Sequence, residues 1–175
     1  MEIELFNDIP KLDPQKTLYF VFPEKALLPK YDLHENAGMD FRARIEKAIP
    51  IENGIVYKIP LGFKIAFPSG FELQIRPRSG LALNGIIIPN SPSTIDPSYR
   101  GEVCVELYNL LSKPYVIQPF ERVCQGVISH YLYNLPFSLS SYKIVFIVNR
   151  KIFEEWHDIF VSKRKTGGFG STGRV

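Results

Sequence analysis

One carboxylate stands out in residues 85–103, which read GIIIPNSPSTIDPSYRGEV. The run Ile86 to Ile88 is β-branched and predicts an extended strand, and the prolines and polar residues after it predict a turn. We therefore expect a hairpin that holds Asp96 between prolines. Such a hairpin offers backbone N–H and C=O groups at fixed spacing, which suits reading the edge of a flat heterocycle beside a carboxylate. A surface turn with a solvated Asp96 is the alternative interpretation.

Two other stretches carry groups that bind anions. Residues 77–85, PRSGLALNG, predict about one helical turn with Ser79 near its N-terminus, where free N–H groups attract anions, and Arg78 adds charge. The stretch 164–175, RKTGGFGSTGRV, surrounds Phe169 with glycines and hydroxyls. Glycine loses the most freedom on ordering, so this stretch cannot hold its own fold, but it can close over a phosphate and a base. A plain turn and a disordered end are the respective alternatives.

Period-two alternation dominates the chain before residue 150. Met39, Phe41 and Ala43 alternate with polar residues, and Val103, Val105 and Leu107 share one face of another strand. The predicted strands are 17–22, 37–45, 45–51, 55–59, 61–67, 71–76, 86–88, 101–109, 115–117, 122–132 and 143–148, with an Asn53-Gly54 tight turn between the third and the fourth and a turn at 68–70. Many short strands without long helices predict an all-β sandwich or jelly roll and exclude a βαβ sheet.

The two ends of the chain lack the alternation that predicts strands. Residues 1–16 mix charge with proline and predict a loosely tied arm. After the strand 143–148, apolar residues at helical spacing predict a short amphipathic helix that packs by its aromatic side chains, with His157 on the solvent face. These residues are Ile152, Phe153, Trp156, Ile159 and Phe160.

Composition sets limits on function. A chain of 175 residues with 45% apolar content predicts one domain, and 21 basic against 18 acidic residues leave a net charge of +3, too small to indicate a nucleic-acid partner. Cys104 and Cys124 lie in apolar strand patterns without zinc or disulfide spacing. No signal-length or membrane-spanning apolar segment is present, so we expect no membrane partner. The expectation is a soluble intracellular protein, cytoplasmic or, in a eukaryotic host, nuclear.

Five segments, in order, resemble the trimeric dUTP diphosphatases (dUTPases). They are AGMDFRA from Ala37, PRSGLA from Pro77, NSPSTIDPSYRGEV from Asn90, ERVCQGVI from Glu121 and RKTGGFGSTG from Arg164. The resemblance implies a jelly-roll-like β-sandwich subunit and a homotrimer whose three sites each draw on all three chains. It divides a single domain into an N-terminal arm (1–16), a β core (17–133), an extended segment (134–162) and a swapped glycine-rich C-terminal arm (163–175).

The resemblance also implies roles for individual residues. Asp96 would activate the water that attacks the α-phosphorus of dUTP, releasing pyrophosphate and dUMP, with Mg²⁺ on the triphosphate and Asp40 acting on the metal through water. Gln125 and Arg164 would assist catalysis. The implied substrate-binding residues are Arg78, Ser79, Gly80, Asn90, Thr94, Ile95, Tyr99, Arg100, Phe169, Gly170, Ser171 and Thr172. The reaction would keep uracil out of DNA and supply dUMP for thymidylate synthesis.

Two departures from the dUTPase pattern leave questions open, and two functions other than dUTP hydrolysis stay possible. Ser93 stands where the family commonly has Gly, which raises the question of a positive φ. The segment 131–162 is longer than expected, so the exit of the arm from the core is undetermined. A dCTP deaminase-like aminohydrolase would release ammonia rather than pyrophosphate. A dUTP-binding regulatory protein, acting through the segment that holds Trp156, would bind the nucleotide without turnover.

Overall fold

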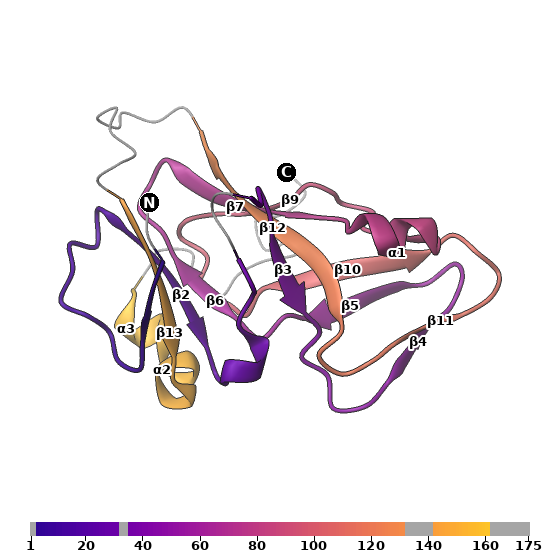
Figure 1. Ribbon diagram of the computed structural model, residues 1–175, viewed down its shortest axis with the longest axis horizontal. Helices are drawn as coiled ribbons and strands as arrows, with labels where there is room; N and C mark the ends of the chain where they lie inside the picture. Colours follow the sequence, from indigo (N-terminus) through magenta and orange to yellow (C-terminus); the bar gives the residue numbers. More distant parts are fainter. Residues whose placement is uncertain (1–2, 32–34, 132–141, 162–175) are drawn as a thin grey trace, which may run out of the picture.

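The computed structural model describes residues 3–31, 35–131 and 142–161, and their strands form four sheets (Figure 1). The all-β prediction is confirmed. The first sheet has the order β1-β13-β2-β6, with β1 (Ile3–Phe6), β13 (Lys143–Val148), β2 (Thr17–Phe22) and β6 (Lys64–Ala66). β13 runs parallel to both β1 and β2. All six residues of β2 are buried because both faces of this sheet are covered.

The second four-stranded sheet carries most of the predicted site. Its order is β3-β12-β7-β9, with β3 (Met39–Arg42), β12 (Arg122–His130), β7 (Phe71–Arg76) and β9 (Ser93–Ile95), all antiparallel. The period-two prediction for β3 is confirmed, since Met39 and Phe41 are buried while Asp40 and Arg42 are half-buried. Register places Asp40 opposite Gln125, and Gln125 opposite Arg76.

Two smaller sheets complete the strands. One has the order β5-β10-β8, with β5 (Val56–Pro60), β10 (Cys104–Asn109) and β8 (Ile86–Ile87); the other pairs β4 (Ile49–Ile51) with β11 (Tyr115–Ile117). In β10, Val105 and Leu107 are buried together with Val103 just before it, as predicted. Figure 1 shows β4 and β11 at one end of the molecule and α2 and α3 near the other.

The sequence predicted turns correctly but not the partners of the strands that follow them. Gly54 has φ +83, which confirms the turn there, yet β4 pairs with β11 while β5 pairs with β10. The hairpin predicted around Asp96 is wrong in the same way: β8 pairs with β10, and β9 pairs with β7. The chain therefore passes from one sheet to another between β4 and β5 and between β8 and β9. Turn residues determine where the chain reverses, but they do not determine which strand the next segment pairs with.

Two hydrophobic clusters lie on opposite faces of the first sheet. Phe20, Phe41 and Phe63 belong to the main core, and the rings of Phe41 and Phe63 stack with centroids 4.1 Å apart. The second cluster joins Tyr19 and Val145 to the fully buried Trp156. Sequence periodicity alone does not show that the first sheet is buried on both faces.

Helices are few and short. They are η1 (Lys25–Leu27), α1 (Ser79–Leu83), α2 (Arg150–Glu154) and α3 (Trp156–Ile159). The one helical turn predicted near Ser79 is confirmed as α1. The single helix predicted after residue 148 is instead two, with His157 exposed as expected. The loosely tied arm expected over residues 1–16 contains β1, paired with β13. In the ranges described, no helix is both long and apolar enough to cross a membrane.

Candidate functional site

Asp40 lies at the centre of a cluster of charged side chains. Arg78 Nε donates to Asp40 Oδ1 at 2.9 Å, and Arg122 Nη1 donates to Oδ2 at 3.2 Å. Arg78 Nη1 also donates to the Arg122 carbonyl oxygen at 2.9 Å. Charge-assisted bonds of this kind fix a guanidinium in position. The structure thus joins the predicted residues Asp40 and Arg78. It adds Arg122, a residue of the fourth segment that is not among the predicted site residues.

Gln125 orders the backbone beside this cluster. Its Nε2 donates to the Pro77 carbonyl oxygen at 2.8 Å, one residue before Arg78. A Cβ added at Gly38, just before β3, would come within 2.4 Å of Gln125 Oε1, so glycine leaves room for the Gln125 side chain in this position. Gln125 therefore holds the start of α1 close to the β3 backbone.

The first turn of α1 is open to solvent. Ser79 and Gly80 are exposed, and the Arg78 backbone before them is extended, with φ −93 and ψ 135. Nothing lies within 4 Å of a Cβ built on Gly80. The backbone of this turn is therefore accessible to a ligand, in line with the anion-binding prediction.

Asp96 begins a compact turn that ends at Tyr99. Tyr99 N–H donates to the Asp96 carbonyl oxygen at 3.0 Å, and the Tyr99 hydroxyl donates to the Glu102 carbonyl oxygen at 3.0 Å. Burial raises the pKa of Tyr99 to about 12, so the ring stays neutral. Asp96 itself is half-buried. The turn presents a carboxylate and an aromatic ring from one short piece of chain.

The residues before this turn are more exposed. Asn90 Nδ2 lies 3.4 Å from Ser93 Oγ, and Thr94 is exposed on β9 whereas Ile95 is buried. Ser93 does not need a glycine conformation: among the residues described, Phe120 is the one non-glycine residue with positive φ. Ser93 therefore does not have the positive φ that would favour glycine at this position.

We expect Gly101→Ala to displace the Tyr99 ring. A Cβ at residue 101 would lie 2.4 Å from the Tyr99 hydroxyl oxygen and 2.6 Å from its Cζ, closer than such atoms approach. The ring must then leave the Glu102 carbonyl. The measurement is the affinity for a non-hydrolysable dUTP analogue by calorimetry, which we expect to weaken while circular dichroism stays that of the wild type. Unchanged affinity would contradict the substrate-binding role predicted for Tyr99.

The two halves of the predicted site lie apart within one chain. Ile95 is opposite Leu73, and the Pro97 carbonyl accepts from Phe67 N–H at 3.5 Å, so Asp96 lies at the N-terminal end of β7. Asp96 is one residue beyond Ile95 and so falls level with Glu72. The row of Asp40, Gln125 and Arg76 lies four residues further along β7, which is about 14 Å at 3.4 Å per residue. A single chain does not bring Asp96 to Asp40.

Arg100 is buried rather than presented to a ligand. It is 8% exposed, and Nε donates to the Phe160 carbonyl at 2.8 Å while Nη1 donates to those of Pro97 at 2.7 Å and Tyr99 at 3.0 Å. Burial lowers the pKa of Arg100 to about 10. The substrate contact predicted for Arg100 has no support in this placement, because its donors meet protein carbonyls.

Five predicted site residues lie outside the described ranges. They are Arg164, Phe169, Gly170, Ser171 and Thr172. Their roles stay predictions.

The two cysteines take no part in this chemistry. Both are free thiols, and burial raises the pKa of Cys104 to about 11 and raises that of Cys124 as well. Neither therefore forms a thiolate readily.

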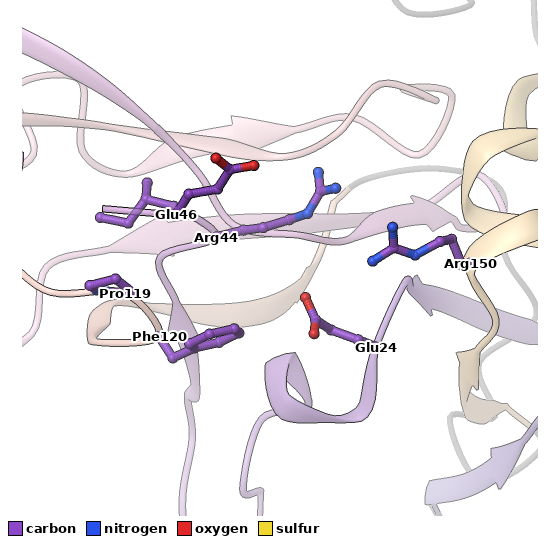
Figure 2. A pocket seen from close by; sticks show the side chains of 7 residues that line it. Glu24, Arg44, Glu46, Pro119, Phe120 and Arg150 are labelled. Atoms are coloured by element: carbon purple, nitrogen blue, oxygen red, sulfur yellow. The ribbon is translucent and has the colours of Figure 1, made fainter. Parts of the chain in front are cut away.

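A cleft of about 590 Å³ lies elsewhere, between β3, η1 and α2 (Figure 2). Arg44, Phe120 and Arg150 line it together with Glu24 and Glu46. Arg44 is already paired with Glu102 at 3.1 Å. None of the predicted site residues lines this cleft.

Comparison with known proteins defines first the class and then the family. The fold is that of the dUTPase subunits: dUTPase from Streptococcus mutans matches with a TM-score of 0.58 and 26% identity over 66% of this chain and 94% of that one. The native dUTPase of EIAV matches with a TM-score of 0.56 at 23% identity, over 69% and 96%, a likeness of fold alone.

Sequence relatives give the family. The dUTPase family model matches residues 24–173. Deoxyuridine 5'-triphosphate nucleotidohydrolase of Rickettsia massiliae is 42% identical over 147 residues, 83% of this chain and 88% of the relative. That of Fusobacterium nucleatum is 37% identical over 148 residues, 84% and 90%. The chain belongs to the dUTPase family, as the five segments predicted.

Proposed function

We propose that this protein hydrolyses dUTP to dUMP and pyrophosphate. The observation that carries the proposal is the family match over residues 24–173, which contains all five segments, together with relatives named as nucleotidohydrolases of deoxyuridine 5'-triphosphate. The ordered contacts of Asp40, Arg78 and Gln125 support it, because they hold the groups expected to meet the triphosphate.

Asp96 acts as the general base in this proposal. Its carboxylate orients a water and takes its proton as the oxygen bonds to the α-phosphorus. The bond from that phosphorus to the bridging oxygen breaks, and pyrophosphate leaves. Arg78, held by Asp40 and the Arg122 carbonyl, is preorganised to meet phosphate charge, so no reorientation is needed during the reaction.

Mg²⁺ enters with the triphosphate, as part of the substrate. Within the described ranges no three His, Cys, Asp or Glu side chains gather to hold a metal, which suits an ion that keeps its waters and is bound mainly by substrate phosphates. Asp40 reaches this ion through water. When bound, the ion neutralises phosphate charge and makes the attacking water more acidic.

The residues around Asp96 select the base and the sugar of the substrate. Asn90, Thr94 and the backbone through Ile95 read the uracil edge, and Tyr99 packs under deoxyribose where a 2′-hydroxyl would collide. If cytosine entered a site whose fixed donors and acceptors match uracil, some of these buried polar groups would stay without a hydrogen-bond partner. The resulting loss of kcat/KM reaches roughly 10⁴-fold in sites of this kind.

A homotrimer completes the site. Because Asp96 and Asp40 lie about 14 Å or more apart along the sheet, a neighbouring copy must supply one half. The glycine-rich arm supplies the rest, with Arg164, Ser171, Thr172 and the Gly170 backbone on phosphates and Phe169 on the base. The activity would keep uracil out of DNA and provide dUMP for thymidylate synthesis.

A substrate panel tests the function. With dUTP, dCTP, dTTP and UTP in Mg²⁺, we expect pyrophosphate release from dUTP alone and no ammonia from any of them. Ammonia from dCTP would identify a deaminase instead. Binding of dUTP by calorimetry without product would identify the regulatory alternative.

A further inference from the structure

Arg100 connects the Asp96 turn to the helices at the end of the described chain. We call α2 and α3, with Phe160 after them, the C-terminal helical unit. The Arg100 guanidinium donates to the Phe160 carbonyl on one side and to the Pro97 and Tyr99 carbonyls on the other. One rigid, planar group therefore spans the unit and the turn.

The burial of Arg100 explains why these carbonyls matter. Arg100 is 8% exposed, and no carboxylate in the described ranges forms an ion pair with it. A buried cation without a counter-ion is costly unless its donors are satisfied, so the carbonyl dipoles must stay where they are. Nε and Nη1 of Arg100 meet these requirements with backbone carbonyls of the turn and of Phe160.

The C-terminal helical unit is itself firmly placed. Trp156 is fully buried, and its Nε1 donates to the Ile65 carbonyl oxygen at 2.9 Å, which Arg100 Nη1 also approaches at 3.4 Å. Lys64 Nζ donates to the Phe153 carbonyl oxygen at 2.6 Å and lies over the Phe153 ring, 4.4 Å from its centroid. Phe160 N–H donates to the Trp156 carbonyl oxygen at 2.9 Å, and the two rings lie with centroids 4.4 Å apart. Trp156 therefore sets the position of the Phe160 carbonyl, whereas Lys64 binds α2, at the other end of the unit.

We propose that Arg100 is a positioning residue, through which the C-terminal helical unit holds the Asp96 to Tyr99 turn in its reactive geometry. This inference rests on the proposed function, since it assigns the turn its catalytic task. It gives the extended segment a function: β13, α2 and α3 support the turn, and the glycine-rich arm begins three residues after Phe160, whose carbonyl Arg100 binds.

Three variants of the full-length protein test the proposal. Arg100→Met removes the donors at similar length, and Arg100→Lys keeps the charge but loses the fork of donors. Lys64→Met is the matched control, because it removes another cation that binds a carbonyl of the same unit without touching the turn. For each we would measure the melting temperature, kcat and KM for dUTP well below melting, and hydrogen exchange over residues 96–101.

The expected results separate positioning from stability. Arg100→Met should lower kcat at least about tenfold, with a smaller change in KM, because a misplacement of 1 Å can cost about 10²-fold. Arg100→Lys should lie between Arg100→Met and wild type. Exchange at the Tyr99 amide, which donates to the Asp96 carbonyl, should accelerate in Arg100→Met. Lys64→Met should lower the melting temperature but keep wild-type kcat and exchange.

Two outcomes would overturn the proposal. The first is a folded Arg100→Met with wild-type kcat and wild-type exchange. The second is equal loss of kcat in Arg100→Met and Lys64→Met, which would make both residues purely structural. If the wild type releases no pyrophosphate from dUTP, the proposed function fails by itself, and the exchange rates of the three variants still decide whether Arg100 holds the turn.

Discussion

Asp96→Asn should lower the turnover of dUTP by at least about 10², because the amide keeps the shape of the carboxylate but cannot accept a proton from water. Binding should survive, since the backbone that reads the base and the ring of Tyr99 are unchanged. Pyrophosphate release gives the turnover, calorimetry with a non-hydrolysable dUTP analogue gives the affinity, and light scattering after size-exclusion chromatography gives the oligomeric state.

Asp158→Asn is the matched control for this prediction. Asp158 lies on α3 with a side chain that is 73% exposed and interacts with His157 at 3.1 Å, so this carboxylate is not among the groups that hold the unit in place. The same chemical change there should leave turnover at the wild-type level. Turnover retained in Asp96→Asn would remove Asp96 from the mechanism and leave the base unassigned.

Ending the chain after Lys163 should abolish hydrolysis and leave the melting temperature nearly unchanged. The removed stretch holds Arg164, Phe169 and two hydroxyl residues, which are the groups proposed to meet the phosphates and the base. Its glycines make it costly to order without a ligand, so it contributes little to the stability of the free protein. Differential scanning calorimetry and a pyrophosphate assay are the two measurements.

A shorter truncation controls for the loss of chain length. Removing only Arg174 and Val175 leaves the fifth segment, RKTGGFGSTG, whole, and hydrolysis should be retained. A collapse of the melting temperature after the longer truncation would show instead that the glycine-rich stretch supports the fold.

Local patterns predicted the elements well. The alternation in β3 and β10, the turn at Gly54 and the short helix at Ser79 all follow from side-chain period and turn chemistry, which act over a few residues. The resemblance over five segments predicted the family, because each segment keeps its residue types in order. Strand pairing could not be predicted in this way, because no local pattern shows that β8 and β9 join different sheets or that β1 pairs with β13.

The sequence by itself determined the β-rich class, the family and the residue types available for chemistry. Only the tertiary structure decided that Arg122 joins Asp40, that Arg100 is buried against the Phe160 carbonyl, and that Asp96 lies at the other end of the sheet from Asp40. The reason is physical. Side-chain period and turn preference depend on neighbours in the chain. Burial, ion pairing and strand order depend on contacts between residues as far apart as Ile3 and Ile144, and the packing of the whole core selects those contacts.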